Sequence, residues 1–266
     1  MNSSIGIIGL GFVGGSILKS FQIKGINVEG YDKYKNGGIG KFENMYQKEF
    51  LFLCLPTLYN NELKKYDLSS IEETCKLLEN KYSGIVIIKS TVEPETTYML
   101  SEKYHLKIIH NPEFLSAATA FEDFHNQTHI VLGTGPNISN TELQTLKNFY
   151  LSHYPEAEIS LVTSNESESM KIFVNSFYAT KIQFFNELYL VCQENSCDYN
   201  VIKNLMLKNK WINPMHTQVP GSDGSLSYGG ACFPKDTQAL LEYMKRKKSR
   251  HQVLQAVVDE REEMRN

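Results

Sequence analysis

The sequence predicts an α/β protein with a Rossmann-type, doubly wound and mainly parallel sheet, followed by a long helix and a small all-helical domain. Three observations carry this prediction. Short apolar runs alternate with helical patterns up to about residue 162, a glycine-rich turn follows the first strand, and the run from Thr163 contains no proline or glycine until Pro214. Such alternation is typical of parallel strands covered on both faces. We therefore expect two domains, 1–162 and 163–266.

The first domain is expected to begin with a glycine-bounded strand at Ser4–Gly9, and to hold a central strand at Phe50–Leu55, where every residue is apolar. A strand that is apolar on both faces lies buried within a sheet. The further strands are expected at Asn27–Tyr31, Gly84–Lys89, Lys107–Ile109, Thr128–Leu132 and Glu158–Val162, and the helices at Phe12–Lys24 and near 68–81, 95–104 and 139–151.

The second domain is expected to open on a long helix, because Thr163 and Glu166 have the spacing of a capping box. Continued to about Asn195, this helix would be roughly 45 Å long at ~1.5 Å per residue. Apolar side chains cover more than one of its faces, which indicates burial against the sheet domain and against a second subunit, and hence a homodimer. A shorter helix near 198–207, a long loop over 209–230, a helix from Pro234 and another near 250–264 are expected to follow.

Composition excludes several classes of function. The formal net charge of −3 gives no general attraction to nucleic acid or to an anionic membrane. No apolar stretch is long enough to span a bilayer, and the N-terminus has no charged region typical of a signal peptide. The five cysteines are odd in number, lack zinc-ligand spacing and fit a reducing compartment. We therefore expect no metal, no nucleic-acid partner and no membrane partner.

The turn Gly9-Leu10-Gly11-Phe12-Val13-Gly14 follows a predicted strand and opens a predicted helix. This context is typical of a dinucleotide site, in which the glycines allow a tight turn, approach of the pyrophosphate and close helix packing. Asp32 ends the next strand, where it can bind ribose hydroxyls and repel the extra phosphate of NADP; otherwise it is only a turn residue. The expected NAD-binding residues are Gly9, Gly11, Phe12, Val13, Gly14, Asp32, Lys33, Leu55, Pro56, Thr57, Ser90 and Thr91.

A second motif surrounds Cys232, which stands between Gly229-Gly230 and Pro234. Proline suits the first turn of a helix, and both a helix dipole and a nearby Lys171 would favour the thiolate. Asp236, four residues later, would lie on the same side of that helix. The alternative is a buried structural cysteine.

Three further residues are candidates for catalysis. Lys171 and Asn175 are four residues apart on the long helix, so they share one face and could hold an oxygen that becomes negatively charged. Glu113 follows a strand end, where a carboxylate can orient or deprotonate water. The alternatives are a solvent-facing Lys/Asn pair and a glutamate that stabilises a helix start.

These motifs together resemble the UDP-glucose/GDP-mannose dehydrogenase family, and the resemblance covers nearly the whole chain. It implies cytoplasmic, NAD-dependent oxidation of a nucleotide-sugar C6 alcohol, most simply UDP-glucose to UDP-glucuronate, for polysaccharide biosynthesis. The matching segments are Gly9–Gly14, Ser90–Val92, Asn111–Leu115, Glu168–Glu187 (with Lys171, Asn175, Ala179, Lys181, Ile182, Asn186 and Glu187) and Gly229–Asp236.

The resemblance also implies individual roles. Cys232 would capture the aldehyde and leave a thioester after a second hydride transfer, while Asp236 would support proton transfer. Lys171 and Asn175 would stabilise the charged oxygen. Glu113 would activate water with the help of Thr91. The expected substrate-binding residues are Glu113, Phe114, Leu115, Lys171, Asn175, Tyr228 and Gly229.

The sequence departs from the family pattern in three places. The chain ends 30 residues after Asp236, so it is expected to be a short form without the C-terminal UDP-binding domain. Ala117 stands where many members have a glutamate, and Trp211 where many have an arginine that reaches the partner's sugar. Two other functions therefore stay open: a dehydrogenase of a smaller alcohol or hydroxy acid, and an NAD-binding subunit that is inactive or depends on a partner.

Overall fold

The computed structural model describes residues 3–116 and 118–265 and divides into two compact units. Unit 1 comprises residues 1–57 and 67–171, and unit 2 comprises residues 58–66 and 172–266. The chain therefore passes between the units at three points. These units are groups of residues that pack together, and they do not test the predicted division into domains at 162/163, which stays a prediction.

Unit 1 is built on a seven-stranded sheet with the order β2-β1-β3-β6-β7-β8-β9. All neighbouring strands are parallel except β7 and β8, which are antiparallel. This confirms the predicted doubly wound, mainly parallel sheet. The strands are β1 (Ile5–Ile8), β2 (Val28–Tyr31), β3 (Phe50–Leu53), β6 (Ile85–Ile88), β7 (Lys107–His110), β8 (His129–Thr134) and β9 (Glu158–Thr163).

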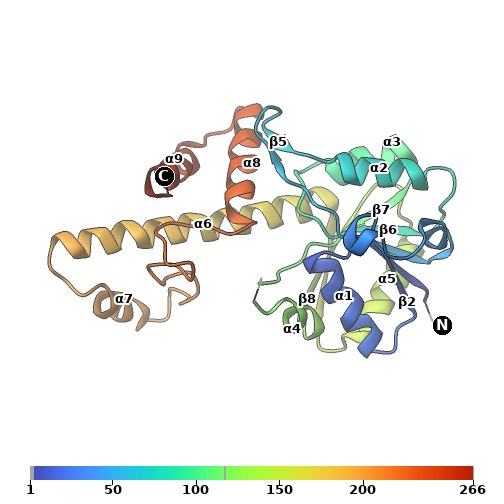
Figure 1. Ribbon diagram of the computed structural model, residues 1–266, viewed down its shortest axis with the longest axis horizontal. Helices are drawn as coiled ribbons and strands as arrows, with labels where there is room; N and C mark the ends of the chain where they lie inside the picture. Colours follow the sequence, from blue (N-terminus) through green and yellow to red (C-terminus); the bar gives the residue numbers. More distant parts are fainter. Residues whose placement is uncertain (1–2, 117, 266) are drawn as a thin grey trace. The chain divides into compact units, whose positions relative to one another are not determined.

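Helices cover both faces of this sheet (Figure 1). Along β3, Phe50 and Phe52 pack in one apolar core with residues of α1 and α5, whereas Leu51 and Leu53 pack in a second core with residues of α2 and α3. Successive side chains of a strand point to opposite faces, so an entirely apolar strand needs a core on each side. The helices of unit 1 are α1 (Phe12–Ile23), α2 (Ser69–Leu78), α3 (Thr96–Tyr104), α4 (Ala120–His125) and α5 (Asn140–His153), with 3-10 turns at η1 (Lys35–Gly37) and η2 (Phe42–Gln47).

The long helix α6 (Ser164–Glu194) begins and ends close to the predicted residues. The Glu166 amide N–H donates to the Thr163 hydroxyl at 3.3 Å, and the Glu166 carboxylate accepts from the Thr163 amide N–H at 2.8 Å. This is the reciprocal pair of a capping box. The first turns of α6 belong to unit 1 and the remainder, from Ile172, to unit 2.

Unit 2 contains the rest of α6, three further helices and a small hairpin. Two apolar clusters lie along α6, one around Phe185 and Tyr199 and the other around Ala179 and Tyr228. The loop over 209–230 has no regular secondary structure, as predicted. The elements are α7 (Tyr199–Leu207), α8 (Phe233–Arg246), α9 (Gln252–Arg265) and the antiparallel strands β4 (Tyr59–Asn60) and β5 (Lys65–Tyr66).

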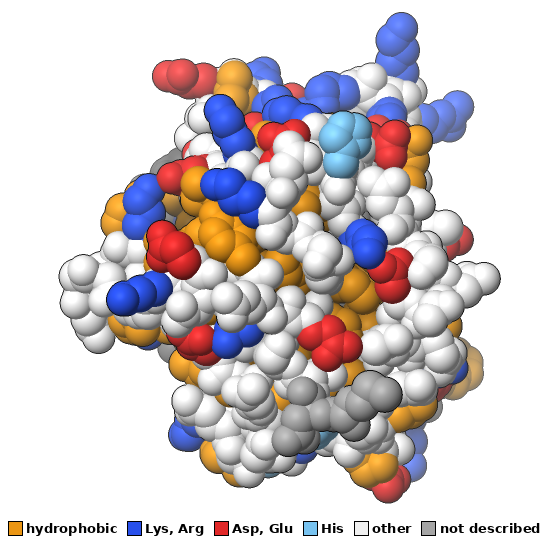
Figure 2. Space-filling model, turned by 90° about the vertical axis from the view of Figure 1, so that its right-hand side faces the viewer, with side chains coloured by type: hydrophobic (Ala, Val, Ile, Leu, Met, Phe, Trp, Pro, Cys, Tyr) orange, Lys and Arg blue, Asp and Glu red, His pale blue; other side chains and the backbone are white. Residues whose placement is uncertain are grey.

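The surface shows little separation of charge by sign. On the face shown in Figure 2, basic and acidic side chains are scattered among each other. Among the helices of the described residues, none combines the length and apolar character needed to cross a bilayer.

Candidate active site

The glycine turn between β1 and α1 has the backbone that a dinucleotide site requires. Gly9 has φ +88°, a value that side chains rarely tolerate, and a Cβ on Gly14 would lie 1.9 Å from the Gly9 carbonyl oxygen. A Cβ on Gly11 would meet nothing within 4 Å. The first and third glycines are therefore fixed by the fold, whereas the second leaves open space where a phosphate group can approach.

Asp32 stands after β2 and is held by backbone donors. Its carboxylate accepts from the amide N–H groups of Leu10 at 2.7 Å, Tyr34 at 2.9 Å and Lys35 at 2.8 Å. Burial alone would raise the pKa of Asp32, but these hydrogen bonds lower it below its ordinary value. An ionised carboxylate has about four acceptor positions, so it retains capacity for ribose hydroxyls.

These features fit NAD. The N-terminal amide groups of α1 have no side-chain cap, which is the arrangement that favours a phosphate. Phe12 is exposed and Val13 packs partly against the core beneath the turn. Lys33 forms an exposed ion pair with Glu73 at 2.8 Å.

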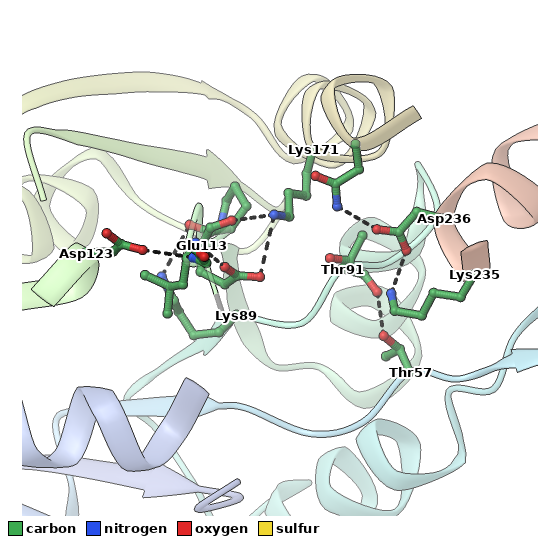
Figure 3. Close-up of polar contacts among 12 residues, drawn as sticks. Thr57, Lys89, Thr91, Glu113, Asp123, Lys171, Lys235 and Asp236 are labelled. Carbon is green, nitrogen blue, oxygen red and sulfur yellow. Dashed lines mark hydrogen bonds and ion pairs between the residues drawn. The ribbon is translucent and has the colours of Figure 1, made fainter. Parts of the chain in front are cut away.

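The loops after β3 and β6 are joined by side-chain hydrogen bonds. The Ser90 hydroxyl donates to the Leu55 carbonyl at 2.6 Å and accepts from the Leu55 amide at 3.1 Å. The Thr57 hydroxyl donates to the Thr91 carbonyl at 2.7 Å (Figure 3). The residues predicted from two separate strand ends, with Pro56 between Leu55 and Thr57, therefore lie together at one edge of the parallel sheet. Their contact with NAD stays a prediction.

Glu113 and Lys171 meet within unit 1. The Lys171 ammonium donates to the Glu113 carbonyl at 2.5 Å, lies 3.5 Å from its carboxylate and stands 5.3 Å from the centre of the Phe114 ring (Figure 3). The Glu113 carboxylate also accepts from the Leu115 amide at 2.6 Å. Lys171 is buried, so this is a desolvated pair in which charge interactions are strong.

Sequence reasoning missed Lys89, which supports the same loop. Its side chain is buried, and its ammonium donates to the Asn111 side-chain oxygen at 2.9 Å and to the Pro112 carbonyl at 3.3 Å. Burial lowers the pKa of Lys89 to about 8. The available signal was a lysine placed directly after the apolar strand 85–88 and before Ser90.

Asn175, Cys232 and Asp236 come together within unit 2. Cys232 is an exposed thiol at the N-cap of α8, and the Asp236 amide donates to its carbonyl at 3.0 Å. The Asp236 carboxylate is fully buried and accepts from the Asn175 side-chain amide at 2.6 Å (Figure 3). A thiol at a helix N-terminus and a buried carboxylate one turn later therefore share the start of α8.

The Asp236 carboxylate has two further donors that the sequence did not indicate. The Tyr66 hydroxyl and the Lys235 ammonium each lie 2.5 Å from Oδ1. Tyr66 comes from the β4–β5 hairpin, 170 residues earlier in the chain. Its only local signal was the Asn60-Asn61 pair, typical of a turn.

The loop before Cys232 is shaped by packing in unit 2. The Tyr228 ring is buried, and its carbonyl accepts from Arg261 at 3.2 Å. A Cβ on Gly229 would lie 2.6 Å from the Arg265 guanidinium. The Tyr228 hydroxyl lies 3.3 Å from that of Thr237, so both the side chain and the backbone of Tyr228 hold the loop within unit 2.

Ala117 and Trp211 are the two residues at which the sequence departs from the family pattern. Ala117 lies outside the described residues. Trp211 has 89% of its surface exposed. Within the described part of the chain, no group of three or more His, Cys, Asp or Glu side chains is arranged to hold a metal ion.

Comparison with known families decides the relationship. Residues 39–152 match the NAD binding domain of the UDP-glucose/GDP-mannose dehydrogenase family, and residues 165–262 match its central domain. The chain belongs to this family. The family consists of NAD-dependent nucleotide-sugar dehydrogenases, and NAD is the cofactor.

Curated relatives of the family are longer than this chain. This chain is 30% identical to UDP-glucose 6-dehydrogenase of Campylobacter jejuni over 210 residues. The aligned region covers 75% of this chain and 49% of the relative. The chain is also 30% identical over 202 residues to UDP-glucose 6-dehydrogenase of Streptococcus pneumoniae, covering 72% and 49%. The chain thus spans about half the length of these relatives.

Solved structures share the fold. A UDP-glucose dehydrogenase from the archaeon Pyrobaculum islandicum has a TM-score of 0.84 at 23% identity, covering 97% of this chain and 68% of its own. A 3-hydroxyisobutyrate dehydrogenase from Mycobacterium tuberculosis has a TM-score of 0.70 at 13% identity, covering 97% and 92%. At these identities the likeness concerns the fold alone.

Proposed function

We propose that the chain oxidises the C6 alcohol of a nucleotide sugar to the carboxylate, with UDP-glucose as the first candidate and UDP-glucuronate as the product. One observation carries the proposal beyond family membership. An exposed thiol, Cys232, stands at the start of α8, one turn before the buried and hydrogen-bonded Asp236. An alcohol dehydrogenase that stops at the aldehyde has no use for such a thiol.

The overall reaction balances as one alcohol, two NAD⁺ and one water giving one carboxylate, two NADH and three protons. NAD, when bound, accepts the hydride removed in each oxidation. The Cys232 sulfur would add to the aldehyde carbon and form a thiohemiacetal. Loss of a hydride and a proton from this adduct gives a thioester on the same sulfur. Water then breaks the carbon–sulfur bond, releasing the carboxylate and the thiol.

The remaining candidates have roles that suit their chemistry. Lys171 and Asn175, one turn apart on α6, would donate to the oxygen that becomes negatively charged. Glu113, with Thr91, would orient and deprotonate the water that attacks the thioester. Asp236 would accept or relay a proton close to Cys232.

We also infer that the chain forms a homodimer through α6. Large apolar side chains on this helix are exposed within unit 2, including Phe177 at 62%, Phe184 at 53% and Val191 at 54%. Their spacing of seven residues places them on one side of the helix. Phe184 and Val191 also line an apolar hollow of about 320 Å³ formed with α7. Exposed apolar surface of this kind is typical of an interface. Sedimentation equilibrium should give a dimer mass, and Phe177→Asp should shift it to the monomer; a monomeric wild type would contradict the inference.

A substrate screen tests the proposed reaction. Purified protein with excess NAD is offered UDP-glucose, other nucleotide sugars, and small primary alcohols and hydroxy acids, and NADH is followed by absorbance. We expect turnover confined to nucleotide sugars. Turnover confined to small alcohols would replace the substrate class, and none with any compound would favour an inactive or partner-dependent subunit.

A further inference from the structure

The buried carboxylate of Asp236 is surrounded by three donors, all on side chains. Tyr66 and Lys235 approach Oδ1 at 2.5 Å each, and Asn175 approaches Oδ2 at 2.6 Å. Asp236 and Tyr66 are 0% and 2% exposed, so neither the acceptor nor the phenol has much contact with bulk water. Hydrogen bonds to a charged acceptor are stronger than those between neutral groups.

The Tyr66 hydroxyl is carried by a hairpin whose placement is itself defined. Tyr66 pairs with Tyr59 across the two strands, and the Lys64 carbonyl accepts from the Arg246 guanidinium at 2.8 Å. Arg246 is the last residue of α8, and Asp236 is in its first turn. The hairpin is therefore held at both ends of the same helix. The Lys235 ammonium, 4.7 Å from the centre of the Tyr66 ring, adds a cation–π contact at the first turn.

The hairpin is an excursion of the chain from unit 1 into unit 2. It occupies residues 58–66 of unit 2, whereas the segments on either side belong to unit 1. It starts one residue after Thr57, whose hydroxyl bonds to the loop after β6. Tyr66, whose hydroxyl contacts Asp236, therefore follows Thr57 by nine residues in the chain.

We propose that Tyr66 is a positioning residue for the reaction, acting through Asp236. Its hydroxyl fixes Oδ1, which leaves Oδ2 directed at Asn175 and holds the carboxylate in one orientation, one helical turn after Cys232. Without this donor the carboxylate keeps Lys235 and Asn175 but loses the hydrogen bond from the Tyr66 hydroxyl of the hairpin. This inference rests on the proposed function and adds a residue to it.

The test uses the full chain and four variants: Tyr66→Phe, Asp236→Asn, the double variant, and Tyr199→Phe as the matched control. Tyr199 is also a buried tyrosine of unit 2, and its hydroxyl donates to the neutral Thr217 carbonyl at 2.6 Å. kcat and KM are measured for UDP-glucose and NAD, or for the best compound of the substrate screen. Thermal unfolding midpoints are recorded for all five proteins.

We expect Tyr66→Phe to lower kcat by about 10- to 100-fold, the usual effect of removing a hydrogen bond to a charged group. KM for both substrates should change less than about threefold, because a residue that acts on the chemical step leaves ground-state binding unchanged. In the Asp236→Asn background the same substitution should change kcat less than about threefold, since coupled residues are not additive. Tyr199→Phe should keep kcat within about twofold while lowering the unfolding midpoint similarly.

Three results would overturn the inference and leave the proposed function standing. They are a wild-type kcat in Tyr66→Phe, an equal loss from Tyr66→Phe with and without the Asp236 carboxylate, and a fall in kcat that Tyr199→Phe reproduces. No turnover by the wild type would instead remove the proposed function, and the catalytic role of the pair with it.

Discussion

Two fully buried carboxylates, Glu168 in unit 1 and Asp236 in unit 2, are held by different kinds of donor. Glu168 accepts from the backbone amides of Glu95 at 2.8 Å and Thr97 at 2.7 Å, at the start of α3. Asp236 accepts only from the side chains of Tyr66, Lys235 and Asn175 among the contacts described above.

The two kinds of donor suggest different roles for the two carboxylates, stability for Glu168 and catalysis for Asp236. Backbone donors are present whatever the local side chains are, and a carboxylate at a helix start satisfies amides that would otherwise have no partner. Side-chain donors must be supplied residue by residue. Those of Asp236 come from the neighbouring Lys235 and from two distant segments, which carry Tyr66 and Asn175. We therefore expect Glu168 variants to change unfolding and Asp236 variants to change turnover.

The largest effect is expected from Asp236→Asn. Replacing the carboxylate with an amide removes a proton acceptor, so kcat should fall by about 10²- to 10⁴-fold. The free energy of unfolding should fall by only about 1–3 kcal/mol, the usual range for a mispaired buried polar group. Steady-state kinetics and urea unfolding measure the two quantities. A kcat within threefold of the wild type would remove Asp236 from the mechanism.

Glu168→Ala should show the opposite pattern. Two amides at the start of α3 would lose their acceptor, so the free energy of unfolding should fall by about 3 kcal/mol, while kcat per folded molecule stays within about threefold. Glu194 is exposed and lies at the end of α6, the helix that also contains Glu168. Glu194→Ala should change the free energy of unfolding by less than about 0.5 kcal/mol. Equal losses from both substitutions would contradict a specific role for Glu168.

The pH dependence of stability sharpens the same contrast. Burial raises the pKa of Glu168 to about 7 from 4.5, despite the hydrogen bonds from Thr97 and Glu95 that lower it. The folded protein therefore binds this proton more tightly than the unfolded chain does. The resulting stability is complete below pH 4.5 and is lost as the pH rises through 7.

Urea unfolding of the wild type and Glu168→Gln at several pH values measures this loss. The unfolding free energy of the wild type minus that of Glu168→Gln should fall by up to about 3 kcal/mol as the pH rises from 4.5 through 7. A difference that rises with pH would show that the carboxylate is more stable ionised in the folded protein.

The smallest effect is expected where a carboxylate is well bonded but exposed. Glu73 pairs with Lys33 at 2.8 Å, yet its side chain is 56% exposed. Glu73→Gln should change the free energy of unfolding by less than about 0.5 kcal/mol, because exposed ion pairs contribute little. A loss above 2 kcal/mol in urea unfolding would show that contact distance matters more than burial.

Local patterns in the sequence were sufficient for most of the fold. The apolar strand at Phe50–Leu53, the glycine turn at Gly9–Gly14 and the capping box at Thr163 each depend on residues close together in the chain. Strand direction is less local. The antiparallel pairing of β7 with β8 was not specified by either strand, and the short helix α4 in the connection between them was not predicted.

The candidate site divides in the same way. Cys232, Asp236, Lys171 and Asn175 were identified from spacing and from the family resemblance, and Glu113 was found beside Lys171. Tyr66 could not be predicted, because its contact with Asp236 joins residues 170 positions apart and its hairpin strands are only two residues long. Lys89 was missed because a lysine is ordinarily exposed and only the folded structure shows its burial.

The oxidation of the C6 alcohol to the carboxylate is tested most directly by the number of NADH molecules formed per UDP-glucose consumed, with purified protein and excess NAD. We expect two NADH per sugar, with UDP-glucuronate as the product, and loss of the carboxylate product in Cys232→Ser. One NADH per sugar with an aldehyde product, or carboxylate formed by Cys232→Ser at the wild-type rate, would contradict it.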